Sequence, residues 1–384
     1  MSKKSQVLDT SNKINAQQLI DILNLELNTI FADPDSVKIM PPLLIKGSPG
    51  CGKSSIVRSV CEERGIDFID VRLSQIEPCD IKGLPVPNRE NNTMDWFVNG
   101  TWPRDPNGKG IIFLDEITSA DRSIQVAAYE LVLDRRLGKL YQVPPGYLIV
   151  AAGNLTTDKA VATVMSSALA NRFMHVQLQE DAESWLEWGR ANNIHPSVLG
   201  FIAFKPNMLF NMEGENLSSG WPSPRSWERV SKICHIYESS DETLLRTMIY
   251  GLIGNGTGVE FMAFHKLNVQ FKNVLSYMID PEKDVSEIIS DKAEMKYALT
   301  ATIAYLVWRG KNEEDTNARL DGFFRITEQL TSDFAVMAFY AAYKSTNAAE
   351  TKYRCSKLLT HPRFKDFKTK HYTKLSKYLK TIKV

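Results

Sequence analysis

The feature that most constrains this chain is the eight-residue segment GSPGCGKS, which fits the pattern G-x-x-x-x-G-K-S with Gly47, Gly52, Lys53 and Ser54. The glycines allow a tight turn and a close approach of backbone N–H groups to an anion, without a Cβ clash. A short apolar run, Leu43–Ile45, precedes the segment, and a helical pattern follows it. This strand–loop–helix context predicts a phosphate-binding loop.

Two side chains of this loop are predicted to contact the nucleotide or its metal ion. Lys53 is expected to reach the β and γ phosphates, and the hydroxyl of Ser54 is a hard oxygen ligand for magnesium. The substrate and cofactor predicted from these residues are ATP and Mg²⁺.

A second acidic motif follows an apolar strand in the segment GIIFLDEI, which ends in Asp115 and Glu116. Ligands of open α/β sheets bind at the carboxyl ends of the strands. Asp115 is therefore predicted to hold the magnesium shell, and Glu116 to polarise the water that attacks the nucleotide. The residues predicted to bind the nucleotide or its metal are Gly47, Pro49, Gly50, Cys51, Gly52, Lys53, Ser54, Ser55 and Asp115.

Short apolar runs that alternate with helical patterns predict a parallel five-stranded sheet with helices on both faces. The expected strands are Leu43–Ile45, Phe68–Leu73, Ile111–Leu114, Tyr147–Ala152 and Met174–Leu178. After about residue 180 the strand signals end, and helical patterns predict an all-helical second domain. The expected organisation is a helix and linker at 1–40, an α/β core at 41–190 with an insertion at 74–110, a helical lid at 191–345 and a basic helical tail at 346–384.

Charge is unevenly distributed along the 384 residues. The whole chain has a formal net charge of +1, but residues 351–384 hold eleven basic residues and one acid. Aromatic residues interleave with these lysines, a composition that binds nucleic acid. The other interpretation is an amphipathic helix that docks its aromatics on the lid and keeps its lysines in water.

Several classes of protein are disfavoured. The start of the chain has no apolar core after its lysines, and no run reaches the roughly 18 apolar residues of a membrane helix. The five cysteines form no C-x-x-C pair, which argues against a disulfide framework, and the histidines are dispersed, which argues against a second metal site. No G-x-S-x-G element suggests a serine hydrolase. We expect a reduced, cytoplasmic protein.

These motifs resemble the AAA+ superfamily and, within it, the MoxR-like ATPases, over about residues 38–235. The strand in YLIVAAGN ends at the position of sensor 1, so the resemblance implies that Asn154 orients the attacking water. SSALANRF matches the stretch that makes Arg172 the candidate arginine finger, acting on a neighbouring subunit's nucleotide. In GWPSPRSWERV, Ser223 and Pro224 are expected to begin a helix, and Arg225 resembles sensor 2.

The resemblance also implies an oligomeric ring, expected to be a hexamer, that couples ATP hydrolysis to chaperone-like remodelling of a protein partner. The implied partner contains a von Willebrand factor A domain. The segment DIKGLPVP resembles an insertion that faces the central pore, and the nearby Trp96, Phe97 and Trp102 either touch a substrate or pack a local hairpin. Two alternatives stay open: a DNA-associated motor or translocase that uses the basic tail, and a nucleotide-dependent scaffold.

Cys51 is a departure from the usual loop, where small or polar residues are commoner. A cysteine near a helix N-terminus can have a lowered pKa and be oxidised. The alternative is that Cys51 is merely tolerated.

Overall fold

The computed structural model describes residues 12–138, 141–155, 165–212, 220–237, 241–270, 273–343, 345 and 348–379. The chain divides into two compact units, Met1–Asp181 and Ala182–Val384. Within the described residues, no helix is both long enough and apolar enough to cross a membrane.

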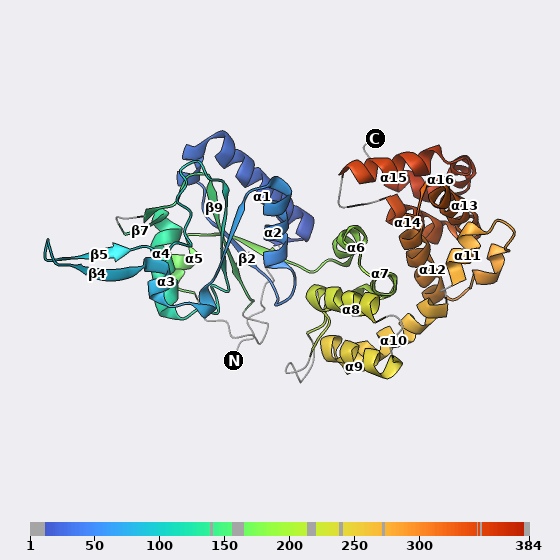
Figure 1. Cartoon of the computed structure of the whole chain (residues 1–384), viewed down its shortest axis with the longest axis horizontal. Coiled ribbons are helices and arrows are strands. Elements are labelled where there is room, and N and C mark those ends of the chain that lie inside the picture. The colour runs from blue at the N-terminus through green and yellow to red at the C-terminus, as the bar shows by residue number, and fades with distance from the viewer. Residues whose placement is uncertain are drawn as a thin grey trace, which may run out of the picture. The chain divides into compact units, whose positions relative to one another are not determined.

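The first unit is built on a parallel six-stranded sheet (Figure 1). Its strands, in the spatial order β1-β10-β2-β9-β6-β3, are β1 (Lys13–Ile14), β10 (Met174–Leu178), β2 (Leu43–Lys46), β9 (Tyr147–Gly153), β6 (Gly110–Asp115) and β3 (Asp67–Arg72). The α/β fold class predicted from the sequence is confirmed, but the count of five strands was wrong. The sixth strand, β1, pairs only two residues with β10, so it is too short to leave a pattern in the sequence.

Helices cover both faces of this sheet. The unit's helices are α1 (Ala16–Ala32), η1 (Pro34–Lys38), α2 (Lys53–Arg64), η2 (Leu73–Gln75), α3 (Pro78–Lys82), α4 (Arg122–Asp134) and α5 (Ser167–Ala170). Alternate residues of a strand face opposite ways, so Ile111 and Phe113 belong to the core under α1 and α2, whereas Ile112 and Leu114 belong to the core under α4. Figure 1 shows α1 and α2 on one side of the sheet and α4 on the other.

The insertion between β3 and β6 forms a protruding hairpin (Figure 1). Its strands β4 (Leu84–Asn88) and β5 (Thr93–Phe97) pair antiparallel with each other and with no other strand. A second small hairpin, β7 (Arg136–Leu137) and β8 (Tyr141–Gln142), follows α4.

The described part of the second unit is helical throughout. Its elements are α6 (Ala182–Ala191), α7 (Pro196–Phe204), η3 (Pro206–Met208), α8 (Pro224–Ile236), α9 (Glu242–Ile253), α10 (Asn255–Gln270), α11 (Val274–Ile279), η5 (Val285–Ile288), α12 (Ala293–Leu306), α13 (Glu313–Gln329), α14 (Ser332–Tyr343), α15 (Ala348–Thr360) and α16 (Phe364–Leu379). Part of its core is aromatic: fully buried Trp227 contacts the rings of Phe201 and Phe261, at centroid distances of 5.4 and 5.3 Å.

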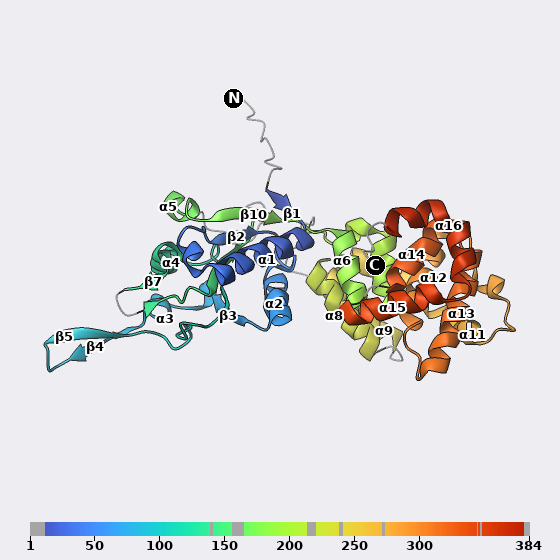
Figure 2. The same cartoon turned by 90° about the horizontal axis from the view of Figure 1, so that it is seen from above.

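The basic tail forms helices α15 and α16, which pack against the other helices of this unit (Figure 2). Phe367 is fully buried against Phe324 and Phe339. Basic side chains pair with acids on α13 and α14, in the bridges Lys357–Glu313 (2.6 Å), Arg363–Asp321 (2.8 Å) and Lys374–Asp333 (2.7 Å). These contacts match the interpretation of a docked amphipathic helix. The side chains at 377 and 378, and the whole of the lysines at 380 and 383, lie outside what the structure describes.

Candidate functional site

The parallel topology brings the candidate residues of the first unit to one edge of the sheet. Gly47 follows β2, Asn154 follows β9, Asp115 ends β6, and Ser74 follows β3. These four strands are neighbours and run the same way, so their carboxyl ends meet. The site is therefore assembled from segments that are more than 100 residues apart in the sequence.

Glycines shape the phosphate loop in two ways. Gly50 and Gly52 have φ angles of +83° and +101°, a region that other residues rarely adopt. At Gly47, a Cβ would lie 3.0 Å from both the Cys51 Sγ and the Leu178 carbonyl oxygen. The loop therefore needs glycine for its backbone turn and for its close packing, and it leads directly into the first residue of α2.

Lys53 is buried and folds back over the loop. Its Nζ donates to the carbonyl oxygens of Gly47 (2.6 Å) and Ser48 (3.1 Å) and to the Asn154 Oδ1 (3.2 Å). A fourth contact, to the Cys51 Sγ (3.9 Å), is also with a neutral group, so these acceptors solvate the ammonium without balancing its charge. A buried cation beside a glycine loop and a helix N-terminus suits a phosphate anion.

The acidic pair stands at the end of β6. The half-buried Asp115 accepts a hydrogen bond at Oδ1 from the backbone N–H of Glu116 (2.9 Å). Burial raises the pKa of Asp115, which the nearby charges of Asp70 and Glu116 raise further. A divalent cation would relieve this cost of burying a carboxylate, and the Asp115 carboxylate and Ser54 hydroxyl are the hard oxygen ligands that Mg²⁺ takes.

Glu116 is held in an unusual conformation. Its φ is +59°, which is uncommon outside glycine, and its Oε2 accepts a hydrogen bond from the Ser74 hydroxyl. The hydrogen bond from Ser74 fixes where the Glu116 carboxylate lies. Sequence reasoning missed Ser74, although a polar residue directly after a predicted strand was a usable signal.

Asn154 is positioned from both ends. Its backbone N–H donates to the Thr118 hydroxyl (2.9 Å), and its side-chain oxygen accepts from Lys53. Thr118 is buried, and at Gly153 a Cβ would lie 2.5 Å from the Thr118 methyl group. Thr118 is a second supporting residue that no sequence pattern indicated.

Cys51 is not the reactive thiol that a helix N-terminus can produce. Its side chain is buried, and burial raises the pKa of the thiol despite the neighbouring Lys53 charge. A thiol that stays protonated is a poor nucleophile. Cys51 instead packs against the position of Gly47.

Arg172 lies at the amino ends of the strands, whereas the phosphate loop lies at their carboxyl ends. It precedes β10, whose first residue Met174 pairs with Leu43 at the start of β2. Its guanidinium carbon lies 5.9 Å from the ring centroid of Tyr129, and its Nε is buried with no hydrogen-bond partner. This arginine is thus held by its own unit but is not part of the same cluster as Lys53 and Asp115.

Arg225 belongs to the helical unit, in the first turn of α8. The predicted helix start is confirmed: Ser223 is the N-cap, its Oγ accepting from the backbone N–H of Ser226 (3.2 Å), and Pro224 is the first helical residue. The Arg225 side chain is exposed.

The three aromatics near the insertion separate into two groups. Trp102 is only 3% exposed and its Nε1 donates to the Ile81 carbonyl oxygen (3.1 Å), so it packs the core. Trp96 and Phe97 lie on β5 and are 46% and 65% exposed. Of the three, only these two remain available to a partner.

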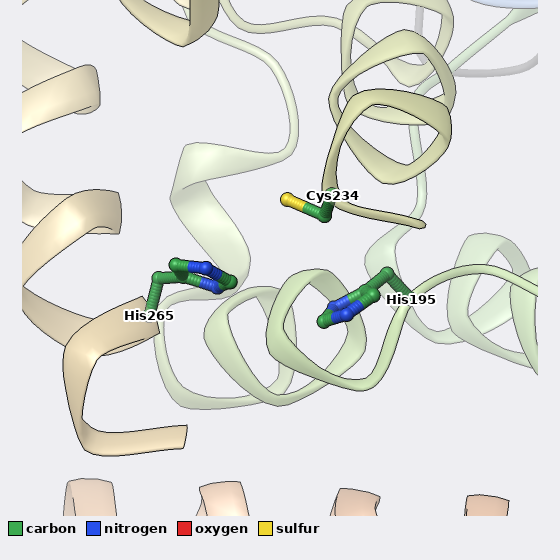
Figure 3. Close-up of side chains that lie close together, drawn as sticks. All are labelled: His195, Cys234 and His265. Carbon is green, nitrogen blue, oxygen red and sulfur yellow. The ribbon is translucent and has the colours of Figure 1, made fainter. Parts of the chain in front are cut away.

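Dispersal of the histidines in the sequence was a wrong guide to their positions. His195, Cys234 and His265 meet inside the helical unit, with candidate ligand atoms within 4.8 Å of one another (Figure 3). The His195 Nδ1, however, accepts the backbone N–H of Ser197 (3.1 Å), and burial lowers the pKa of His195 to about 3. A neutral ring that accepts at Nδ1 carries its proton on Nε2, so His195 is not a metal ligand in this arrangement.

Comparison with known proteins bears on the first unit. The model of the ATPase family associated with various cellular activities (AAA) matches residues 43–177. The denitrification regulatory protein NirQ of Stutzerimonas stutzeri is 28% identical over 120 residues, 29% of this chain and 42% of that protein. Midasin of Dictyostelium discoideum is 24% identical over 156 residues, 36% of this chain and 2% of midasin. This chain thus spans less than half the length of these curated relatives.

Among solved structures, the RuvB Holliday junction branch migration motor of Thermotoga maritima is similar with a TM-score of 0.32 and 13% identity. The match covers 74% of this chain and 81% of that one. The AAA assignment predicted from the motifs is confirmed by the family match at residues 43–177.

Proposed function

We propose that this chain, a MoxR-like protein whose residues 43–177 form an AAA ATPase domain, uses ATP hydrolysis in an oligomeric ring to remodel a protein partner. The observation that carries the proposal is the position of Arg172. It lies at the amino ends of the strands, whereas the phosphate loop lies at their carboxyl ends. In this proposal, Arg172 of one chain therefore acts on the nucleotide site of a neighbouring chain and not on its own.

The residues at the carboxyl edge have complementary roles in hydrolysis. Lys53 binds the phosphates, Glu116 accepts the proton of the attacking water, and Asn154 orients that water. The water oxygen forms a bond to the γ-phosphorus while the bond to the β–γ bridging oxygen breaks, which yields ADP and phosphate. Ser54 and Asp115 would hold Mg²⁺, which when bound neutralises phosphate charge.

A neighbouring subunit would complete the site with its Arg172. Developing negative charge on the transferred phosphoryl group is stabilised by such an arginine, an effect on the order of 10³–10⁵ in rate. The contact with Tyr129 restricts the guanidinium and so lowers the entropy cost of presenting it. Arg225 would couple the helical unit to the nucleotide state.

The β4–β5 hairpin is the surface proposed to contact the partner. Pro85 and Pro87 lack N–H groups, so their pairs with Trp96 and Met94 are the non-hydrogen-bonded ones, and the Trp96 and Met94 backbone groups point away from β4. The outer edge of β5 thus offers backbone groups beside exposed Trp96 and Phe97. An extended apolar segment of another protein suits such an edge.

The identity of that partner follows only from resemblance, which points to a protein with a von Willebrand factor A domain. A cytoplasmic location and a hexameric ring belong to the same proposal. The alternative of a DNA motor finds less support, because Lys357, Arg363 and Lys374 of the basic tail pair with acids of their own unit.

The test measures ATPase activity per chain against protein concentration, for the native chain and for two single variants. Arg172→Ala should lower turnover by a factor on the order of 10³ while ATP binding persists. Glu116→Gln should also bind ATP without turnover. The matched control is Arg89→Ala, an exposed arginine of the same unit, which should keep native turnover.

Mixing the two inactive variants gives the decisive result. In a shared site, an Arg172→Ala chain supplies Glu116 and a Glu116→Gln chain supplies Arg172, so a mixture should regain activity that neither variant has alone. If the mixture stays inactive, and native activity per chain is independent of concentration, the site is complete in one chain. The ring and the remodelling built on it would then be wrong.

A further inference from the structure

A cavity of about 330 Å³ lies within the helical unit, and none of its lining residues is assigned to ATP. It is bounded by α6, α7, α12 and α14, with Arg354 of α15 at its margin. This volume is at the lower end of the range for small-molecule sites, about 300–1,000 Å³. Protein interiors are normally packed without such spaces, so the hollow needs a cause.

The cavity exists because small residues face it from four helices. These residues are Ala191 of α6, Gly200 and Ala203 of α7, Ala301 and Ala304 of α12, and Ala341 of α14. At Gly200 a Cβ would lie 3.1 Å from the Phe264 ring, so α7 packs closely against α10 at this residue. The hollow is thus set by the packing of the surrounding helices.

The charge of its lining has one sign. Three arginines, Arg190, Arg309 and Arg354, line the cavity, and its lining includes no acidic residue. Arg354 donates to Glu350 at 2.7 Å, outside the lining. Arg309 contacts two neutral groups: it donates to the Asn193 side-chain oxygen, and its guanidinium carbon lies 4.0 Å from the Tyr305 ring centroid. The potential inside the cavity therefore favours an anion.

Aromatic rings supply the remaining walls. Tyr297, Tyr305 and Trp308 all line the cavity. The Trp308 Nε1 donates to the Ala342 carbonyl oxygen at 2.5 Å, and Arg354 lies over its ring with the guanidinium carbon 5.6 Å from the centroid. Aromatic walls of this kind stack on a planar group, and the guanidinium groups beside them bind an acidic one.

We propose that this cavity binds a small organic anion that combines a planar apolar ring with a negatively charged group. The alanines and aromatics enclose the ring, and Arg309 with its two neighbouring arginines binds the charge. This site is separate from the phosphate loop and does not depend on the function proposed above.

The probe for the test is 1-anilinonaphthalene-8-sulfonate, a planar ring system with a sulfonate. Its matched uncharged analogue is N-phenyl-1-naphthylamine. Both are titrated against the full chain by fluorescence, with stoichiometry from equilibrium dialysis. We expect the sulfonate to bind one molecule per chain, and Arg309→Gln to weaken it at least about tenfold, since a charge-assisted hydrogen bond is lost. The same variant should leave binding of the uncharged analogue unchanged.

Two further variants separate the cavity from the rest of the surface. Ala301→Phe fills the hollow and should abolish binding of both probes, with circular dichroism checking that the helices persist. Arg246→Gln removes an exposed arginine of the same unit that does not line the cavity, and should change neither affinity.

Native affinity for the sulfonate in Arg309→Gln, or retained binding in a folded Ala301→Phe, would overturn the proposal. So would loss of sulfonate binding in Lys53→Ala, which would place the probe in the phosphate loop. Because Arg309 is exposed, its variant remains informative even if Ala301→Phe does not fold.

Discussion

The two units of this chain differ in how their buried polar groups are paired. In the α/β unit, the charged groups of the site lie at one edge of the sheet, where Lys53 contacts only neutral acceptors and Asp115 pays a burial cost. In the helical unit, some buried polar groups bond to one another, as Ser197 does with His195 and His265. The first arrangement favours binding a ligand, whereas the second favours stability of the fold.

The difference follows from the architecture. In a parallel sheet the carboxyl ends of all strands lie on the same side. The loops there hold polar side chains that find their partners in a bound ligand. A helical bundle satisfies its backbone within each helix, so its interior polar side chains need partners from neighbouring helices. Substitutions in the two units should therefore act on different quantities, and three such changes test this.

The largest effect is expected on the rate of ATP hydrolysis, from a change at the carboxyl ends of the strands. Glu116→Gln removes the base but keeps the shape, so turnover should fall by a factor on the order of 10²–10⁴. The thermal midpoint should change little, because the Glu116 carboxylate lies at a ligand edge and not in the core. Single-turnover hydrolysis and a melting curve measure both quantities.

The matched control for that change is Ser74→Ala. It keeps the Glu116 carboxylate and removes only the hydroxyl that holds it. Turnover should then stay within about a hundredfold of native, since a hydrogen bond to a charged carboxylate contributes roughly 1.5–3 kcal/mol. A Ser74→Ala loss as large as that of Glu116→Gln would mean that positioning, and not proton acceptance, limits the rate.

The next effect concerns Glu26, which breaks the pattern of the α/β unit because it is a carboxylate inside the core. It is 6% exposed on α1, and its Oε2 has no hydrogen-bond partner. Burial raises the pKa of Glu26 from 4.5 to about 7. The folded state therefore keeps a proton that the unfolded state loses between those values, and stability falls as the pH rises through this window.

Glu26→Gln should remove that fall. The variant should be more stable than the native chain by about 3 kcal/mol above pH 7, and by almost nothing near pH 4.5. Urea unfolding at a series of pH values measures the difference. Glu62→Gln, an exposed change on α2, is the control. A constant offset between the Glu26→Gln and native chains at every pH would exclude titration of Glu26 as the cause.

The smallest effect is expected in the helical unit, at Ser197. Its hydroxyl lies 2.9 Å from the His265 Nδ1, and both residues are buried. Ser197→Ala leaves that ring nitrogen without this partner, which should lower the free energy of unfolding by about 1–3 kcal/mol. Turnover should not change. The exposed Ser356→Ala is the control, and a loss of turnover in Ser197→Ala alone would contradict the division of roles between the units.

Features that lie in one continuous segment could be predicted from the sequence, whereas features that join separate segments could not. The phosphate loop and the acidic strand end are continuous segments, and so is the start of α8 at Ser223. Ser74 and Thr118 escaped prediction because their roles exist only once separate strands lie side by side. The strand β1 escaped because two residues carry no periodicity. The sequence left open whether Cys51 is an oxidisable thiol or merely tolerated, and its burial, which raises the pKa of the thiol, favours the second.

The sequence by itself determined the parallel α/β fold, the helical character of the second unit and the chemical identity of the site residues. Each depends on local periodicity or on a motif whose residue types the backbone demands. Only the tertiary structure decided which of these residues lie together at the carboxyl ends of the strands, and that Arg172 lies at the amino ends. It also decided that alanines from four helices enclose a cavity lined by arginines. Such relations depend on strand order and helix packing, in which segments far apart in the chain become neighbours.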